Sequence, residues 1–364
     1  MAITVLQQPT TPNVTGTQLI YCISSSNIPQ YQFRYIADLY YSGSTDKLSR
    51  FKYPANGSGT CNIALQRPIK DYLGYDYNWK ISDVQEITTS SKEFEIKFGE
   101  EFGTSYSSSV NVFTNQASAS IQAFKGAVYP SQTSNGFNWT SQPILTNSPV
   151  TQSFDTDNYL TATVYDTNAT VKYYQTGSLT ATKNYVSAGK FSAVPISPLN
   201  VSNYTNSDAI TLDVTGSSIR YEVNNDCRND RHRIAFVNKF GFFDYYTCNT
   251  ALRRVTNIDR KTYEQSFVDL NDRIATYDSA NRGEEQYYTE YTDEFEFTTD
   301  SITSEDSQWL REMFQSSEVF TQSGSNMIPI NILNTRETIL NDTARNKNYQ
   351  YTVRYQFSNL REPR

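Results

Sequence analysis

Aromatic and aliphatic side chains fall at every second position in several separate stretches of this chain. The clearest stretch is Tyr349–Phe357, in which five such residues alternate with four polar or charged ones. A period of two is the period of a β-strand with one buried face. The chain holds 28 tyrosines and 20 phenylalanines, and aromatic residues favour pleated, half-buried surfaces. The sequence therefore predicts a mainly β fold.

The length of 364 residues allows two or three domains, each with its own core. Short strands separated by turn residues favour β-sandwich or barrel-like domains. We predict an N-terminal β-domain over residues 1–85, a middle β-domain over 86–220 and a C-terminal β-rich domain over 221–364. The clearest predicted strands besides Tyr349–Phe357 are Gln32–Tyr41, Glu93–Phe98, Tyr288–Thr298 and the hairpin of Arg233–Asn238 with Phe242–Thr247.

One short amphipathic helix is predicted over residues 304–315. Thr303 or Ser304 is the expected N-cap, and two acidic residues follow in the first turn. Trp309, Leu310, Met313 and Phe314 form an apolar stripe at helical spacing. Two roles are open for this stripe. It packs the helix on a sheet, or it docks a partner, with Trp309 as an interface residue.

The sequence offers little support for catalysis. His232 is the only histidine, so no site can use two imidazoles as acid, base or metal ligands. Paired carboxylates could hydrolyse glycosides, but their separation cannot be read from the sequence. Acidic clusters near Asp155 and Asp269 lack the complete pattern of a calcium loop and are expected to be turns. We therefore predict a non-enzymatic protein with no catalytic, cofactor-binding or metal-binding residues.

The four cysteines are expected to be reduced thiols. Cys22, Cys61, Cys227 and Cys248 lack the spacing of a zinc site or a redox motif. Cys22 and Cys61 could lie on neighbouring strands. The start of the sequence has no signal-peptide pattern, and no apolar run reaches the length of a membrane-spanning helix. The expectation is assembly in a cytoplasm without membrane insertion.

Charge is distributed unevenly in the C-terminal region. The chain carries a net charge of -7, which argues against direct binding of nucleic acid. Residues 226–261 hold eight basic and four acidic residues, a net +4, whereas 262–308 hold two basic and thirteen acidic residues, a net -11. Opposite charges on different surfaces would guide head-to-tail association of subunits. The predicted interface residues are Arg228, Arg231 and Arg233 on the basic side and Glu284, Glu285 and Glu290 on the acidic side.

Several segments resemble a pattern in virion proteins of tailed phages that infect Bacteroidetes, including crAss-like phages. The segments are FRYIADLYYSG with RFKYPANGSGTCNIALQRPIKDYL near the start, then QPILTNSPVTQSFDTDNYL, RIAFVNKFGFFDYYT and SEDSQWLREMFQSSEVF. They are spread over most of the chain, in the family's order. Two positions depart from the pattern, because Phe236 replaces a common Trp and Phe242 replaces a common Gly.

The resemblance implies a structural component of a virion, in the tail, the neck or a vertex-associated assembly, and no catalytic residues. Its implied partners are other copies of the chain and other virion proteins. An alternative from a different class is a receptor- or carbohydrate-binding β-protein of the virion, with a host surface glycan as the ligand. Aromatic side chains that stack on sugar rings would support this alternative.

Overall fold

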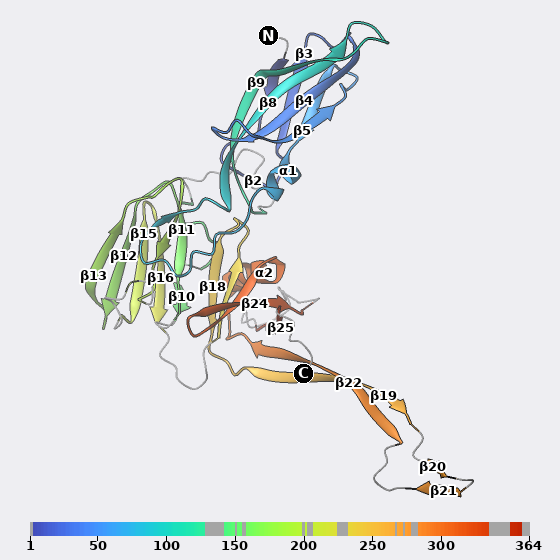
Figure 1. The fold of residues 1–364 in the computed structure, drawn as a ribbon. Helices are drawn as coiled ribbons and strands as arrows, with labels where there is room; N and C mark the ends of the chain where they lie inside the picture. Colours follow the sequence, from blue (N-terminus) through green and yellow to red (C-terminus); the bar gives the residue numbers. More distant parts are fainter. Residues whose placement is uncertain are drawn as a thin grey trace. The chain divides into compact units, whose positions relative to one another are not determined.

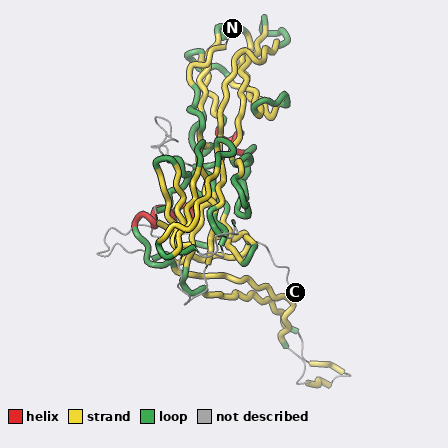
Figure 2. Tube along the Cα trace, turned by 90° about the vertical axis from the view of Figure 1, so that its left-hand side faces the viewer, coloured by secondary structure: helices red, strands yellow, loops and turns green. Residues whose placement is uncertain are grey.

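The computed structural model is mainly β, as predicted, with several separate sheets and two helices among the described residues (Figures 1 and 2). It describes residues 3–127, 142–149, 151–154, 158–198, 201, 207–223, 232–265, 268–271, 274–277, 283–334 and 350–358. The chain divides into two compact units. The first comprises residues 1–224 with 236–245, and the second comprises 225–235 with 246–364.

The first unit begins with a β-sandwich of a five-stranded and a three-stranded sheet. The larger sheet has the order β2-β9-β8-β4-β5, and the smaller has the order β1-β3-β6. The strands are β1 Ile3–Gln7, β2 Asn13–Val14, β3 Ile20–Ser25, β4 Tyr31–Tyr41, β5 Lys47–Tyr53, β6 Thr60–Ala64, β8 Ser91–Gly103 and β9 Asn111–Phe124. The helix α1 Gln66–Asp71 follows β6 directly.

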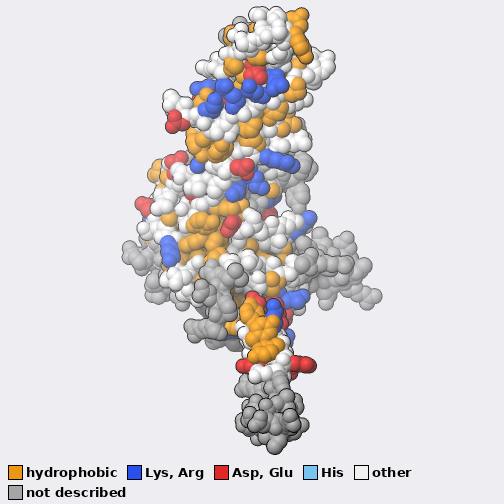
Figure 3. Space-filling view, turned by 45° about the vertical axis from the view of Figure 1, so that its right-hand side comes forward, with side chains coloured by type: hydrophobic (Ala, Val, Ile, Leu, Met, Phe, Trp, Pro, Cys, Tyr) orange, Lys and Arg blue, Asp and Glu red, His pale blue; other side chains and the backbone are white. Residues whose placement is uncertain are grey.

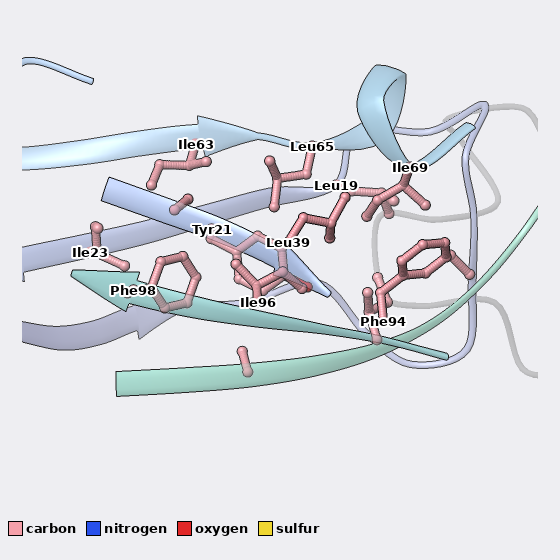
Figure 4. Close-up of a cluster of buried hydrophobic side chains, with 14 of the residues drawn as sticks. Leu19, Tyr21, Ile23, Leu39, Ile63, Leu65, Ile69, Phe94, Ile96 and Phe98 are labelled. Atoms are coloured by element: carbon pink, nitrogen blue, oxygen red, sulfur yellow. The ribbon is translucent and has the colours of Figure 1, made fainter. Parts of the chain in front are cut away.

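Alternation along the strands builds the core of this sandwich. Phe94, Ile96 and Phe98 of β8 are fully buried, whereas the residues between them are half-exposed. They pack against Leu39 of the neighbouring strand β4 and Tyr21 of β3, a strand of the other sheet, in a continuous apolar cluster (Figure 4). Burial of this apolar surface is the main favourable contribution to folding of the sandwich.

The predicted boundary at residues 85 and 86 does not match the strand pairing. Strand β8 pairs with β4 along its length, and β9 pairs with β8, so residues 91–124 belong to the N-terminal sandwich. The sequence pattern identified these strands but could not assign their partners, because pairing between distant strands depends on tertiary contacts. Apart from the short strand Gln85–Glu86, the strands of the two middle sheets all lie at residue 151 and beyond.

Two further sheets complete the first unit. One has the order β10-β16-β15-β12-β13, and the other has the order β11-β14-β7. The strands are β7 Gln85–Glu86, β10 Thr151–Phe154, β11 Thr161–Tyr165, β12 Ala169–Gln175, β13 Ser178–Tyr185, β14 Phe191–Pro195, β15 Ala209–Val214 and β16 Ser217–Val223. Phe124 of the sandwich, Phe191 of β14 and Phe242 pack together in a second apolar cluster.

The predicted hairpin is present as β17 His232–Val237 and β18 Phe243–Cys248. Its turn is ordered by Asn238, whose side-chain oxygen accepts hydrogen bonds from the backbone N–H groups of Phe240 and Phe242. The Asn238 amide also donates to the carbonyl oxygen of Leu145 at 2.9 Å. Phe242 is buried in the second apolar cluster.

The second unit contains most of a seven-stranded sheet with the order β18-β17-β23-β24-β25-β22-β19. Its remaining strands are β19 Arg253–Glu264, β22 Glu284–Thr298, β23 Val319–Ser323, β24 Asn326–Ile332 and β25 Thr352–Phe357, with a separate hairpin of β20 Val268–Asn271 and β21 Ile274–Tyr277. In β25 and just before it, Tyr351, Val353 and Tyr355 are buried, as the alternation predicted. Tyr349 lies outside the described residues.

The predicted helix is confirmed as α2 Ser304–Gln315. Thr303 is its N-cap, and its hydroxyl and the Asp306 carboxylate each accept a hydrogen bond from the other residue's backbone N–H. Trp309, Leu310 and Met313 are buried, and Phe314 lies edge-on to Tyr351 with ring centroids 6.0 Å apart. The apolar stripe is therefore part of the core of the second unit.

Candidate protein–protein interface

Strands β19 and β22 form a long two-stranded ribbon, which we call the β19–β22 ribbon. They pair in antiparallel register from Arg253 opposite Glu296 to Glu264 opposite Glu284, with one irregularity after Lys261. Strand β25 pairs with β22 only from Glu294 to Thr298. The rest of the ribbon extends well beyond the other strands of the seven-stranded sheet (Figure 1).

The ribbon exposes residues on both of its faces. All residues of β19 are exposed except Val255, which is half-buried. From Glu284 to Thr292, β22 is exposed except at Glu285 and Tyr288, and it becomes buried only at Phe295, where β25 begins to pair. A two-stranded hairpin is at best marginally stable in water. The ribbon thus has a large surface that association with another protein could bury.

Several exposed side chains on the ribbon are apolar or aromatic. Ile258 is 53% exposed and lies directly opposite Tyr291, which is 37% exposed. Nearer the distal end, the rings of Tyr263 and Tyr287 contact each other with centroids 6.0 Å apart, and Tyr287 is 63% exposed. Figure 3 shows hydrophobic side chains gathered along the ribbon with acidic side chains beside them. Exposed aromatic residues are enriched at protein interfaces.

Polar contacts between the two strands hold the ribbon in register. Arg254 forms an ion pair with Asp293 at 2.5 Å, and Thr256 donates to the same carboxylate. Asn257 donates to Glu294 at 2.5 Å. Cross-strand pairs of this kind stabilise a sheet by roughly 0.2–1 kcal/mol each. They give the ribbon a defined shape but leave its apolar side chains in solvent.

Three carboxylates at the distal end accept hydrogen bonds from hydroxyl groups. Glu285 accepts from Tyr263 at 2.5 Å, Glu290 from Tyr288 at 3.1 Å, and Glu284 from Thr262 at 2.8 Å. The hydrogen bond to Glu285 raises the pKa of Tyr263, and the bond to Glu290 raises the pKa of Tyr288. Because the donors are neutral, these contacts leave the negative charge of the carboxylates uncompensated.

The structure places the described members of the predicted interface in different environments. Glu284, Glu285 and Glu290 all lie on the ribbon, in the exposed part of β22. Arg228 and Arg231 lie outside the described residues. The sequence analysis did not identify Ile258, Tyr263, Tyr287 and Tyr291, although the alternation over Tyr288–Thr298 marked part of β22 as a strand.

Arg233 and Trp309 are buried and cannot meet a partner on the surface of the chain. Arg233 is 1% exposed and donates to the Thr247 hydroxyl at 2.5 Å. Trp309 is 3% exposed and lies edge-on to Tyr246 with ring centroids 6.1 Å apart. Both assignments as interface residues are corrected here. Arg233 lies in β17, where every residue from Arg233 to Val237 is buried. The alternation of residue types along this strand did not indicate that both of its faces are covered.

A polar groove in the first unit is a second candidate site. It has a volume of about 580 Å³ and lies where the ends of β4, β8 and β9 approach β7 and β14. Lys92, Glu93, Glu86 and Lys190 contribute two positive and two negative charges to its lining. The Gln122 amide donates to the Ser91 hydroxyl at 2.7 Å in the same lining. A balanced set of charges with hydroxyl and amide groups suits an uncharged polar ligand.

Within the described parts of the chain, no three His, Cys, Asp or Glu residues lie close enough together to hold a metal ion. Asp155 lies outside the described residues, and Asp269 lies in β20. Cys22, Cys61 and Cys248 are free thiols, and Cys22 and Cys61 lie on the paired strands β3 and β6, as predicted. In the same described parts, no helix is both long and apolar enough to cross a membrane.

The chain matches no protein-family model and no curated protein.

Proposed function

We propose that this protein is a non-enzymatic structural component of a tailed-phage virion and acts through protein–protein contacts. Its place is in the tail, the neck or a vertex-associated assembly, and it is assembled in the host cytoplasm. The β19–β22 ribbon is the observation that carries the proposal, because it extends from a folded sheet and exposes both faces. The resemblance of several segments to phage virion proteins supports the phage origin.

An isolated ribbon is unfavourable in free energy, and this supports a role in assembly. Ordering a residue's backbone costs about 1–2 kcal/mol, and a hairpin in water offsets little of this by burial. The aromatic side chains of Tyr263, Tyr287 and Tyr291 would contribute much more in contact with a partner than in water. An interaction surface is the role that best fits a long ribbon with exposed apolar groups.

A shortened ribbon tests this proposal. Val255 and Glu294 lie directly opposite each other, so residues 256–293 can be replaced by an Asn-Gly turn that closes the hairpin. This variant keeps the part of β22 that pairs with β25, and we expect its thermal midpoint to match that of the full chain. In cells infected with a phage that lacks the gene, the full chain should appear in purified particles and restore infectivity.

The shortened chain should fold and yet fail to restore infectious particles. Normal titres with the shortened chain would contradict the role of the ribbon. Absence of the full chain from purified particles, measured by mass spectrometry, would contradict the virion assignment itself.

The polar groove supports a second candidate function, the binding of a host surface saccharide. Its lining supplies both hydrogen-bond donors and acceptors, including Gln122, Ser91 and Lys92, and its four charged side chains sum to zero. Neutral sugars present hydroxyl groups that both donate and accept hydrogen bonds. Screening the protein against a glycan array tests this function, with a Gln122→Ala and Lys92→Ala double variant as the control. If the double variant still binds the same glycans, the groove is not the binding site.

A further inference from the structure

The polar groove of the first unit is lined by charges of both signs that are not neutralised within the chain. The charged side chains are those of Lys92, Lys190, Glu86 and Glu93. The ion pairs found among the described residues all involve other side chains. The groove can therefore form ion pairs with a ligand that itself carries both signs of charge.

Both sets of strands that meet at the groove contribute one lysine and one glutamate. The start of β8 supplies Lys92 and Glu93, whereas β7 supplies Glu86 and the residue before β14 is Lys190. Lys92 and Glu93 are consecutive in a strand, so their side chains leave it on opposite sides and do not pair with each other. Positive and negative groups are thus available on both sides of the groove.

Two contacts hold charged groups of the lining in place. The Lys92 Nζ lies 4.8 Å from the ring centroid of Tyr41, at the distance of a cation–π contact. The Glu86 carboxylate packs against the backbone of Gly189, where an added β-carbon would lie 2.3 Å from Glu86 Oε1. Neither contact supplies an opposite full charge, so the ammonium and the carboxylate are positioned without being neutralised.

We propose that the ligand of the polar groove is a saccharide that carries both an amino group and a carboxylate. This inference rests on the proposed saccharide-binding function of the groove and names the class of saccharide. The ammonium group of the ligand pairs with the glutamates of the lining, and its carboxylate pairs with the lysines. Its hydroxyl groups are left to bond to uncharged groups such as Gln122 and Ser91. Such a saccharide has no net charge, in keeping with a lining whose four charges sum to zero.

The lining favours this class over saccharides with one charge or none. A saccharide with a single charge pairs with one set of groove charges and meets the other set as a like charge. A neutral saccharide makes only hydrogen bonds between its hydroxyl groups and the charged side chains. Hydrogen bonds in which both groups are ionised are the stronger kind, so a ligand with both charges gains most from the four side chains.

Four related monosaccharides separate these cases. Muramic acid carries both an amino group and a carboxylate, N-acetylmuramic acid has only the carboxylate charge, glucosamine has only the ammonium charge, and N-acetylglucosamine has neither. At about pH 6 the amines are protonated and the carboxyl groups are ionised. Muramic acid should bind with the lowest Kd in ligand-observed NMR titrations. Loss of either ligand charge should raise the Kd about fivefold, the upper end for a solvent-exposed ion pair.

Two charge-neutral variants assign each ligand charge to its partners. In a chain with Lys92→Gln and Lys190→Gln, muramic acid and glucosamine should bind equally, because the carboxylate has no cationic partner. In a chain with Glu86→Gln and Glu93→Gln, muramic acid and N-acetylmuramic acid should bind equally. Gly189→Ala displaces the Glu86 carboxylate and should change the preference in the same direction as the glutamate variant.

A chain with Lys47→Gln and Lys70→Gln is the matched control. Both lysines are exposed in the first unit and lie outside the lining of the groove. This variant has the same net charge as the lysine variant of the groove. It should keep the preference of the unchanged chain for muramic acid.

The inference is overturned if the four monosaccharides bind equally, or if both charge-neutral variants keep the full preference for muramic acid. In either case, weaker binding by Gln122→Ala would leave the groove as a saccharide site, so the proposed function stands alone. If none of the four binds but the glycan array finds a groove ligand, a ligand that lacks either charge overturns the inference. If the array finds no groove ligand either, the saccharide-binding function itself fails.

Discussion

Gly241 packs against the backbone of Lys125 so closely that a β-carbon placed on it would lie 1.5 Å from the Lys125 carbonyl oxygen. Gly241 also has a φ of +88°, in the left-handed region that side chains other than glycine disfavour. The neighbouring hydrogen bond from the Ala127 N–H to the Lys239 carbonyl, 2.7 Å long, holds the same two segments together. The hairpin turn is therefore fitted to the end of strand β9 at backbone distance.

Replacing Gly241 with Ala should strongly destabilise the first unit. The left-handed backbone alone costs about 1–2 kcal/mol for a residue with a side chain, and displacement of the Lys125 backbone adds to this. Gly177 is the matched control, because it has a φ of +77° and open space around it. Urea unfolding should show a much larger loss for Gly241→Ala than for Gly177→Ala. Equal losses would mean that the turn can move away from Lys125 without cost.

Glu100 is a buried carboxylate whose partners are neutral donors. It is fully buried and accepts hydrogen bonds from Ser25 at 2.5 Å, Asn27 at 2.7 Å and Gln116 at 3.1 Å. Replacement by Gln would remove the negative charge that strengthens these hydrogen bonds and would replace one accepting oxygen by an NH2 group. The expected loss of stability is about 1–3 kcal/mol, because hydrogen bonds to charged groups contribute more than neutral ones. Glu101→Gln is the control and should cost less, because Lys52, its partner, is partly exposed to solvent.

Trp309 anchors α2 to the core of the second unit. Trp309→Ala should lower the free energy of unfolding by about 3–5 kcal/mol, since it removes a large buried side chain and leaves a cavity. The exposed neighbour Gln308 provides the control, because Gln308→Ala keeps the helix and its buried face. Thermal or urea unfolding measures both. Similar small losses for the two variants would place Trp309 outside the core.

Stability should fall at alkaline pH because buried tyrosines resist ionisation. Burial raises the pKa of Tyr35 to about 12 and also raises the pKa of Tyr355. Tyrosines in the unfolded chain lose their protons near pH 10, while Tyr35 in the folded protein keeps its proton. Its contribution to stability is thus fully present below about pH 10 and is lost as the pH rises through about 12. Urea midpoints measured across this range should decrease, and a constant midpoint would contradict the prediction.

The thiols of Cys61 and Cys248 should react slowly in the folded protein. Burial raises the pKa of Cys61 to about 11 and also raises the pKa of Cys248. The thiolate is the reactive form, so little of it is present at neutral pH. Iodoacetamide followed by peptide mass spectrometry should modify these two residues much more slowly in the native protein than in denaturant. Equal rates in the two conditions would show that the strands around them open readily.

The local sequence pattern was sufficient to predict those elements in which the spacing of apolar residues matches the repeat of the helix or strand. The helix over residues 304–315, an N-cap at Thr303 or Ser304, and the buried face of Tyr351, Val353 and Tyr355 could all be predicted, and the structure has the cap at Thr303. In each case the position of apolar residues along one element determines which face leaves water. The mainly β character followed for the same reason, from alternation and from residue types that suit a pleated surface.

Only the tertiary structure decided which strands meet and which surfaces remain open. Strand β8 belongs to the N-terminal sheet because it pairs with β4, a partner more than 50 residues earlier in the chain. Arg233 is buried although its charge suggested a surface position. The charge asymmetry was visible in the sequence, but only the pairing of β19 with β22 sets four of its eight basic residues beside six of its thirteen acidic ones on one ribbon. Burial and pairing depend on contacts between distant residues, and a one-dimensional pattern does not contain those contacts.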